Sequence, residues 1–351
     1  MNANATVIGL DIAKNVFVAV GLTEHGKVVL KKKLSRGEVL AFFANVPPTA
    51  IGIEACAGAH YWARELTTLG HAVKLIAAQH VKAYVTGNKN DTRDAAAIAE
   101  IRARAQTKYV PINTEAQQDL QMLHRARQGL MQERRALFCR LRAFAHEYGK
   151  VFPVGVAKFH QGFRAWLRQA DHGLSAMALA TLRELLAQLD DKDARLSDYD
   201  RRLEQAARND ARAKRLMAVP GIGKLTATAL LASVADAHHF GSGRDLAANV
   251  GLVPHQHSSG GKERLLGISK RGDAYLRTLL IHGARSALRA AGAKPDRCLR
   301  WAVSLQQRKG TNVAAVALAN KMARVAWALL AHDRDYVPTY TRARPSLATA
   351  G

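Results

Sequence analysis

Cysteine is scarce in this chain of 351 residues, and the three that occur, Cys56, Cys139 and Cys298, stand far apart. Because no Cys-x-x-Cys pair is present, the sequence predicts neither a disulfide framework nor a cysteine-ligated zinc site. This usage suits a reducing compartment such as the cytoplasm. The amino terminus also lacks a basic segment before its first apolar run, and Asp11 interrupts that run, which argues against a secretory signal peptide.

Long uninterrupted hydrophobic runs are missing as well. The longest late apolar stretch, residues 313–331, contains Lys321 and Arg324, so a packed helix is expected there rather than a membrane span. Acidic residues are few: 28 Asp and Glu stand against 52 Lys and Arg, which gives a net charge of +24. Such an excess attracts polyanions, so nucleic acid is the predicted partner. With 48% hydrophobic residues, the chain is expected to form two or three packed domains.

Short apolar runs separated by turns predict an α/β domain at the start of the chain. Residues 7–12, 16–22 and 27–30 have the pattern of a three-stranded meander. The expected order after it is helix, strand, helix, strand and helix, at residues 36–44, 50–54, 59–69, 72–76 and from 91 onward. This is the order of ribonuclease-H-like domains, in which the first and fourth strands are parallel neighbours.

Four acidic residues stand at the ends of these predicted elements. Asp11 closes the first strand and Glu54 the fourth, so parallel pairing would place them side by side. Asp91 and Asp94 are three residues apart at the start of an alanine-rich helix, where both point the same way and can bind one hard cation. Taken singly, a strand-end Asp is a common turn residue, and Asp91 suits a helix N-cap. The combination instead predicts a ribonuclease-H-like site for a divalent metal.

Residues 115–148 are expected to form one long helix, with an apolar residue at every seventh position from Leu123 to Phe144. The partner positions include Leu120 and Leu141 but also Arg127 and Arg134, which favours an arm packed against another helix over a two-stranded coiled coil. Residues 174–207 return to helical spacing and complete this helical spacer. Its many arginines predict a basic face exposed to solvent, and a few of these arginines are expected to contact phosphates.

A Pro220-Gly-Ile-Gly223 turn between two predicted helices resembles a helix-hairpin-helix element. Gly221 and Gly223 would let backbone N–H groups approach a phosphate, and Lys224 would add positive charge. The structural alternative is an ordinary glycine turn. The basic character of the chain favours nucleic-acid contact at this turn.

A loop rich in glycine and basic residues follows, in which Ser258 and Ser259 precede Gly260 and Gly261. One interpretation is a phosphate-binding loop, and the other makes one serine a nucleophile toward phosphorus, with cations stabilising the phosphate. The absence of a Gly-x-Ser-x-Gly elbow around these serines argues against a Ser-His-Asp hydrolase. The basic residues expected to contact nucleic acid are Lys262, Arg264, Lys270, Arg271 and Arg277.

Motifs from both halves of the chain carry a resemblance to a known family. They are Gly9-Leu-Asp11-Ile-Ala-Lys14, residues 54–62, Asp91-Thr-Arg-Asp94, Pro220-Gly-Ile-Gly223, Ser259-Gly260 and Gly267-Ile-Ser-Lys-Arg-Gly272. In this order they resemble transposases of the insertion-sequence family called IS-one-ten (IS110). The resemblance is closer to its IS-eleven-eleven (IS1111) subgroup, also known as bridge-RNA-guided DEDD recombinases, and it covers nearly the whole chain.

The resemblance implies a RuvC-like domain in which the four acids form a DEDD tetrad that holds Mg²⁺, with Mn²⁺ as a substitute. A second domain would supply Ser259 as the nucleophile, and Ser258 is the runner-up because the serine is doubled here. A structured guide RNA encoded by the element would pair with donor and target DNA while the protein holds the backbones. The enzyme would act as a dimer or tetramer in the bacterial cytoplasm, at the nucleoid.

The expected fold class is α/β followed by a mostly helical part. Its domains are a RuvC-like domain at residues 1–108, a helical or coiled-coil spacer at 109–208, a C-terminal transposase domain with the helix-hairpin-helix and serine loop at 209–332, and an aperiodic tail at 333–351.

Three other functions are compatible with parts of this pattern. A plain RuvC-like resolvase would use the acids to activate water and needs no serine loop. An actin-like sugar kinase shares the opening fold, but such kinases duplicate it, and no second strand-Asp-Gly phosphate motif follows residue 150. A non-catalytic nucleic-acid-binding protein suits the charge but gives the four acids no role.

Overall fold

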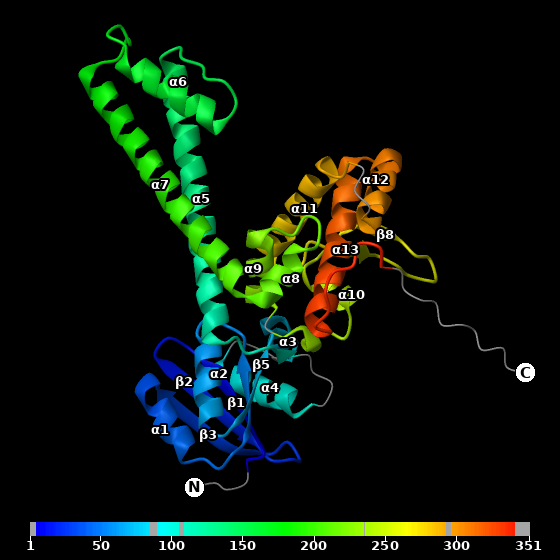
Figure 1. Ribbon diagram of the computed structural model, residues 1–351. Coiled ribbons are helices and arrows are strands. Elements are labelled where there is room, and N and C mark those ends of the chain that lie inside the picture. The colour runs from blue at the N-terminus through cyan, green and yellow to red at the C-terminus, as the bar shows by residue number, and fades with distance from the viewer. Residues whose placement is uncertain (1–4, 85–89, 105–108, 235, 293–295, 341–351) are drawn as a thin grey trace, which may run out of the picture. The chain divides into compact units, whose positions relative to one another are not determined.

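The computed structural model describes residues 5–84, 90–104, 109–234, 236–292 and 296–340. The chain forms two compact units, residues 1–114 and 115–351 (Figure 1). The finer four-part division expected from the sequence stays a prediction, and residues 341–351 of the predicted tail lie outside the described residues.

A six-stranded sheet is the frame of the first unit, in the order β3-β2-β1-β4-β5-β6. Strands β1, β2 and β3 pair antiparallel, β4 pairs parallel with both β1 and β5, and β6 pairs antiparallel with β5. The predicted meander and the parallel pairing of the first and fourth strands are therefore confirmed, while the short edge strand β6 was not predicted. The strands are β1 (Val7–Ile12), β2 (Val16–Leu22), β3 (Val28–Ser35), β4 (Ala50–Glu54), β5 (Ala72–Ile76) and β6 (Tyr109–Val110).

Helices cover both faces of this sheet, because successive side chains of a buried strand point to opposite faces. Ile8 and Leu10 of β1 belong to the core that α1 and α2 complete, whereas Val7 packs with residues of α4 on the other face. Helix α3 was not predicted from the sequence. The helices are α1 (Val39–Ala44, preceded by the 3₁₀ turn Arg36–Glu38), α2 (Ala59–Thr68), α3 (Ala78–Tyr84) and α4 (Asp91–Ala103).

Two glycines lie side by side beneath α4, since Gly9 of β1 and Gly52 of β4 are register partners. A Cβ atom added to Gly9 would lie 2.0 Å from the carbonyl oxygen of Ala95, and one added to Gly52 would lie 3.0 Å from Cγ2 of Ile98. Only glycine leaves room for the helix backbone at the first of these positions. The pair therefore fixes how closely α4 lies on the two parallel strands.

An arm of two long helices begins the second unit, with α5 (Glu115–Glu147) packed along α7 (Ala176–Asn209). The short helix α6 (Val156–Arg168), which the sequence did not predict, joins them at the end of the arm remote from the other helices of this unit (Figure 1). Ion pairs between the two long helices include Arg127 with Asp200, and Arg134 with Asp193. The predicted arm packed against another helix is thus confirmed, and its arginines at the partner positions are paired with acids.

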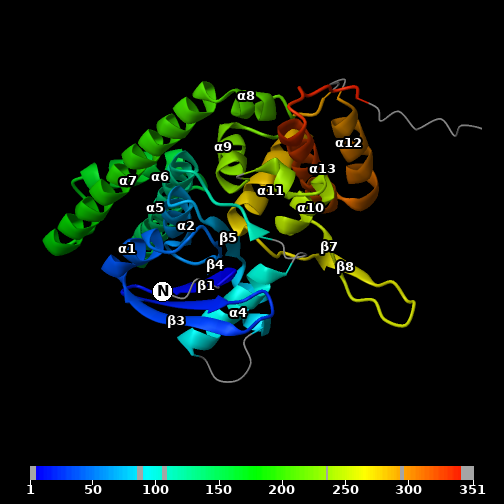
Figure 2. The same ribbon diagram turned by 90° about the horizontal axis from the view of Figure 1, so that it is seen from below.

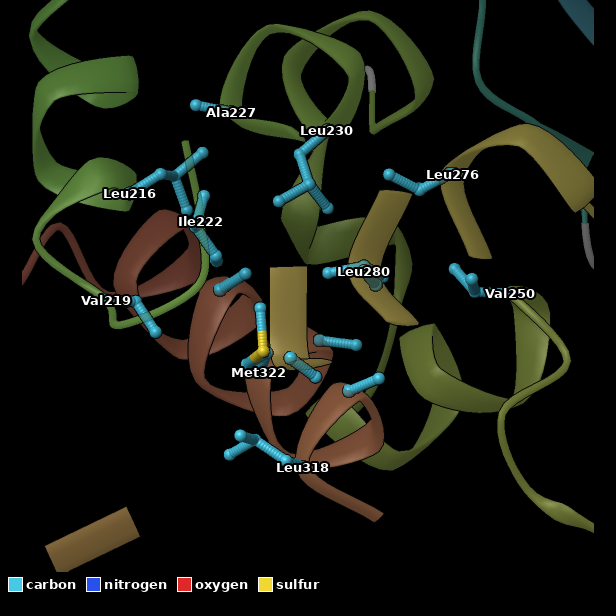
Figure 3. Packing of buried hydrophobic residues seen from close by; sticks show 14 of the residues in the cluster. Leu216, Val219, Ile222, Ala227, Leu230, Val250, Leu276, Leu280, Leu318 and Met322 are labelled. Atoms are coloured by element: carbon cyan, nitrogen blue, oxygen red, sulfur yellow. The ribbon is translucent and has the colours of Figure 1, made fainter. Parts of the chain in front are cut away.

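The remaining helices of the second unit surround a single apolar core. Leu216, Ile222, Leu230, Leu280 and Met322 meet there from separate elements (Figure 3). The elements are α8 (Ala211–Met217), α9 (Lys224–Ser233), the 3₁₀ turn Ala237–His239, α10 (Gly243–Asn249), α11 (Ala274–Arg289), α12 (Arg297–Lys309) and α13 (Thr311–Ala331), with strands β7 (Pro254–Gln256) and β8 (Leu265–Ile268) between α10 and α11.

Helix α13 is long and apolar enough to cross a membrane by those two criteria alone. Ala315, Leu318, Met322 and Ala326 of this helix belong to the apolar core of the second unit. The helix is accordingly a core helix in this fold, as its interrupting Lys321 and Arg324 indicate.

Candidate active site

The carboxyl ends of β1 and β4 carry two of the predicted acids on one face of the sheet. Asp11 lies two residues beyond Gly9, and Glu54 lies two residues beyond Gly52, so both share the face on which α4 packs. Leu10 and Ile53 are register partners, so the next residues along each strand, Asp11 and Glu54, end the parallel pair as neighbours. The predicted placement of Asp11 beside Glu54 is therefore explained by strand register.

The start of α4 brings the other two acids to this place. Asn90 is the N-cap, and its side-chain oxygen accepts a hydrogen bond from the backbone N–H of Thr92 at 2.9 Å. The interpretation of Asp91 as an N-cap is therefore wrong, because the preceding residue already satisfies the helix end. Asp91 and Asp94 both lie in the first turn of the helix, where its positive end favours carboxylates.

Three of the four acids form one cluster. One carboxylate oxygen from each of Asp11, Asp91 and Asp94 lies within 4.8 Å of the others, with Asp11 and Asp94 half-buried and Asp91 exposed. Oxygen-only donors at this spacing suit a hard divalent cation such as Mg²⁺ or Mn²⁺ and do not favour zinc. Glu54 is outside this cluster of described residues, although it ends the neighbouring strand.

A fifth side chain near this site was missed from the sequence. Cys56 follows Glu54 by two residues, and burial, followed by the negative charges of Glu54 and Asp11, raises the pKa of its thiol. The charges of both carboxylates therefore reach the thiol of Cys56. No sequence signal other than its closeness to Glu54 pointed to this cysteine.

The predicted serine loop is a β-hairpin. Strands β7 and β8 pair antiparallel, and Ser259 and Lys262 form a further bridge near the tip. Gly260 and Gly261 lie between them with φ of 55° and 76°, so they form a tight turn that needs glycine at both positions. Figure 2 shows this hairpin extending away from the helices of the second unit. The strands were not predicted because they are short and exposed, without the apolar alternation that marks a buried strand.

The two serines of the hairpin differ in their hydrogen bonds. The hydroxyl of Ser258 accepts a hydrogen bond from the backbone N–H of Arg264, across the hairpin, at 3.2 Å. Ser259 is exposed, and its carbonyl accepts from the N–H of Lys262 at 3.1 Å, while its hydroxyl forms no hydrogen bond among the described residues. Ser259 is therefore the serine whose hydroxyl can turn toward a ligand.

The base of the hairpin is fixed to α10 and α11. A Cβ atom on Gly272 would lie 1.7 Å from the carbonyl oxygen of Asn249, so the chain passes closely there. The guanidinium of Arg277 donates to the carbonyls of Val250 at 2.9 Å and Arg271 at 2.8 Å. Arg277, expected to contact nucleic acid, thus has a structural role, whereas the other four predicted contact residues, Lys262, Arg264, Lys270 and Arg271, are exposed.

The Pro-Gly-Ile-Gly turn lies between α8 and α9, where the sequence placed it. Gly221 has φ of 90°, and a Cβ there would lie 2.8 Å from the carbonyl oxygen of Gly283 in α11. Lys224 forms an ion pair with Glu204 of α7 at 2.5 Å. Close packing therefore explains the glycine at position 221, and the ion pair with Glu204 engages the charge of Lys224. No described residue lies within 4 Å of a Cβ added to Gly223. Phosphate contact at this turn remains a prediction.

Comparison with known proteins places both regions in one group. A family model for a DEDD transposase domain matches residues 8–149, and a model described as "Transposase IS116/IS110/IS902 family" matches residues 213–297. A "Probable family 20 transposase" of Pseudomonas aeruginosa is 46% identical over 336 residues, which are 95% of this chain and 99% of that protein. The chain belongs to the IS116/IS110/IS902 family of transposases.

Other relatives of this transposase carry insertion-sequence names. The "Transposase for insertion sequence element IS1111A" of Coxiella burnetii is 42% identical, covering 94% of this chain and 91% of that protein. The "Transposase for insertion sequence element IS1328" of Yersinia enterocolitica is 39% identical, covering 92% and 96%. The region matched by the DEDD model contains all four acids, and the region matched by the other model contains the glycine turn and the serine hairpin.

Proposed function

We propose that this transposase cleaves and rejoins DNA strands through a covalent bond between DNA and Ser259, at sites chosen by a guide RNA. The observation that carries the proposal is the cluster of Asp11, Asp91 and Asp94 at the end of β1, whose oxygens lie within 4.8 Å of one another. Such a cluster suits phosphoryl transfer, in which metal-bound carboxylates counter the charge that develops on phosphate oxygens.

The first unit is proposed to be a RuvC-like, that is ribonuclease-H-like, domain. Its strand order, with a meander joined through β1 to the parallel strands β4 and β5, supports this assignment. The packing of α4 on Gly9 and Gly52 supports it further, because this packing brings Asp91 and Asp94 to the strand that ends in Asp11. In this proposal Glu54 completes the tetrad from the neighbouring strand.

Mg²⁺, when bound by these acids, supplies positive charge to the phosphate oxygens, and Mn²⁺ can take its place. The fold holds these acids in fixed positions. Asp11 is carried by a buried strand, and Asp91 and Asp94 are carried by the first turn of a helix packed on that strand. Donors held by packed elements need little rearrangement during the reaction, which is the main source of electrostatic catalysis.

Ser259 is proposed to attack the phosphorus atom. A bond forms between its Oγ and phosphorus, one bond from phosphorus to a sugar oxygen breaks, and that oxygen takes up a proton. Because a neutral serine is a weak nucleophile, a base must accept the hydroxyl proton. A carboxylate of the tetrad, from the same or another subunit, is our candidate. The covalent bond conserves the energy of the phosphodiester, so reversal toward another DNA end rejoins strands without ATP.

The guide RNA rests on the resemblance to RNA-guided members of the family, and the net charge of +24 supports it. Base pairing can read sequence, while the protein holds nucleic-acid backbones by charge and shape. Exposed Lys262, Arg264, Lys270 and Arg271 on or beside the hairpin are proposed to hold the DNA phosphates near Ser259.

A covalent adduct is the decisive test of the serine. Labelled DNA and purified transposase with its RNA should give a protein-linked band on a denaturing gel. Ser259→Ala should remove this band and leave DNA and RNA affinity unchanged, because the side chain is exposed. Ser258→Ala, the matched control one residue away, should retain the band. A band that survives Ser259→Ala and is lost in Ser258→Ala would move the nucleophile by one residue.

The acids are tested in the same assay. Asp11→Asn should lower strand cleavage by about 10³-fold or more, the effect of several kcal/mol of lost charge stabilisation. Nucleic-acid affinity should hold or rise, because one negative charge is removed. If neither serine matters while Asp11→Asn abolishes cleavage and ends cut by water accumulate, the protein acts as a plain resolvase and the serine mechanism is wrong.

A further inference from the structure

The helices α11, α12 and α13 have almost no acidic residues. Among the described residues from 274 to 331, the single acid is Asp296, which is buried. Its carboxylate accepts from the N–H of Leu299 at 2.8 Å and from the hydroxyl of Tyr336 at 2.5 Å, so its charge is already engaged. The basic residues in the same range are Arg277, Arg285, Arg289, Arg297, Arg300, Arg308, Lys309, Lys321 and Arg324.

Helix α12 concentrates part of this charge on one face. At 100° per residue, Arg297, Arg300, Ser304 and Arg308 fall within a sector of about 100° together with Trp301. All five side chains are exposed, whereas Leu299 and Ala302, on the opposite side, are buried in the core. The basic face of α12, defined by these five residues, is therefore turned to solvent by the burial of the other side.

Trp301 distinguishes this face from an ordinary solvated surface. Its exposed fraction is 38%, whereas Trp62 and Trp166 are buried and Trp327 donates its ring N–H to two backbone carbonyls. Nζ of Lys321, from α13, lies 4.5 Å from the centre of the Trp301 ring. An exposed indole among cations is the arrangement that stacks nucleic-acid bases while neighbouring charges hold phosphates.

The arm shows what a merely solvated basic surface looks like in this protein. There Arg195 pairs with Asp191, and Arg201 and Arg202 pair with Asp198. Among the described residues, no ion pair involves the basic residues of α11, α12 or α13. Unpaired cations gathered on one face leave their charge available to an anionic partner.

A pocket of about 200 Å³ borders the same face. Arg300 and Ser304 line it together with Leu299 and Val303. It is smaller than the roughly 300 Å³ at which small-molecule sites begin. Its position beside Arg300 suits a single base turned away from a bound strand.

We propose that the basic face of α12 binds single-stranded nucleic acid, with its arginines at the phosphates and Trp301 stacked on a base. Unpaired RNA and single-stranded DNA share the chemistry it recognises. This interface uses none of the acids, serines or hairpin residues of the proposed function. Its success or failure is therefore measured by binding alone, whatever the outcome of the adduct and cleavage assays.

The test compares two triple variants that remove the same charge. Arg297→Ala with Arg300→Ala and Arg308→Ala changes the α12 face, and Arg195→Ala with Arg201→Ala and Arg202→Ala changes paired arginines of α7. The full-length protein is titrated with an oligouridine, an oligothymidine and a random-sequence duplex DNA. The α12 variant should bind both single strands about 10-fold or more weakly, with a log-log salt slope shallower by about 2, the share of three phosphate contacts. The α7 variant should change binding by less than about 2-fold.

Trp301 is tested by paired substitutions. Trp301→Leu should weaken binding of the single strands by about 5-fold or more, the range for loss of one stacked base, and Trp301→Phe should restore most of it. Retained thermal unfolding temperatures would show that both variants fold. Equal losses in the α12 and α7 variants would overturn the proposal, because net charge alone would then explain binding. A loss for duplex DNA as large as for the single strands would also overturn it. A loss of affinity for the oligouridine alone or for the oligothymidine alone would support the interface and show whether it binds RNA or single-stranded DNA.

Discussion

The acidic cluster and the serine hairpin are held in opposite ways. Beneath the cluster, β1 is buried and α4 lies so close to it that a Cβ on Gly9 would come within 2.0 Å of a backbone oxygen. At the hairpin tip, a Cβ on Gly260 or Gly261 would meet nothing within 4 Å in the part of the chain that the structure describes, and the contacts described above fix the hairpin at its base. Packing thus sets the geometry of the acids in advance, whereas the serine is placed by a turn and a short pair of strands. Of the two regions, only the cluster should lose its geometry when packing is disturbed.

The largest effect is expected where packing is closest. Gly9→Val should destabilise the first unit by about 3 kcal/mol or more, because the new side chain meets backbone atoms of α4 that cannot move aside. Mn²⁺ binding at the acids should weaken with it. Thermal unfolding and Mn²⁺ titration of the variant check both effects.

Gly37→Ala is the matched control in the same unit, because no described residue lies within 4 Å of its added Cβ and its φ is not positive. It should unfold like the unchanged protein. Unchanged stability of Gly9→Val would show that α4 can move away from β1. The acidic cluster would then not be held by packing more firmly than the serine hairpin.

A smaller effect is expected at the start of α11, the helix to which Arg277 fixes the base of the hairpin. His124 of α5 lies 3.0 Å from the hydroxyl of Tyr275, near the start of α11, and 3.0 Å from the hydroxyl of Thr228 in α9. Burial, followed by the positive charge of Arg127, lowers the pKa of His124 to about 4, below its ordinary value of 6.5. As the pH falls, His124 takes up a proton in the unfolded chain before it does so in the folded protein. The free energy of unfolding is therefore highest above pH 6.5 and decreases as the pH falls toward 4.

Between pH 7 and pH 4.5 the loss through this histidine should be about 2 kcal/mol. His124→Gln cannot titrate, so its free energy of unfolding should fall by about that much less over the same range. Chemical denaturation of both proteins at the two pH values measures the difference. An equal decrease in the free energy of unfolding for the two proteins between these pH values would mean that His124 is not held neutral by burial.

The smallest effect on stability is expected at the tip itself. Gly260→Ala places a Cβ on a residue with φ of 55°, which costs about 1 kcal/mol locally and favours other turns. Because the added Cβ would meet no described residue within 4 Å, the unfolding temperature should not change, while formation of the serine adduct should slow.

Gly267→Ala in β8 provides the control for the tip, since its surroundings are equally open but its φ is not positive. Rapid-quench gels compare adduct formation by the two variants. If both slow the reaction equally, the shape of the turn is not what places Ser259.

The acidic site was more predictable than the hairpin for the same physical reason. Strand alternation and helical spacing are local rules, so they placed Asp11 beside Glu54, and Asp91 with Asp94, before any tertiary contact was known. The start of α4 at Asp91 and the arm of α5 were predicted equally well.

What escaped prediction depends on contacts between distant segments or on exposed elements with weak patterns. Asn90 caps α4, so the carboxylate of Asp91 is not needed at the helix end and lies in the acidic cluster. The close approach of Gly221 to α11 brings together residues that are far apart in the chain. The strands β7 and β8 carry no apolar alternation, and the edge strand β6 is too short to show any. The basic face of α12 was hidden because arginine content alone does not reveal which cations are paired.

The length of the arm has a mechanical consequence. Helix α5 has 33 residues, which at 1.5 Å per residue spans about 50 Å, equal to about fifteen base pairs of duplex DNA. A lever of that length turns a rotation of about 10° at its base into a displacement of about 9 Å at its tip, more than two base-pair steps. The stiffness of the arm, which the pairs Arg127–Asp200 and Arg134–Asp193 reinforce along its two helices, therefore limits how far its tip can move relative to its base.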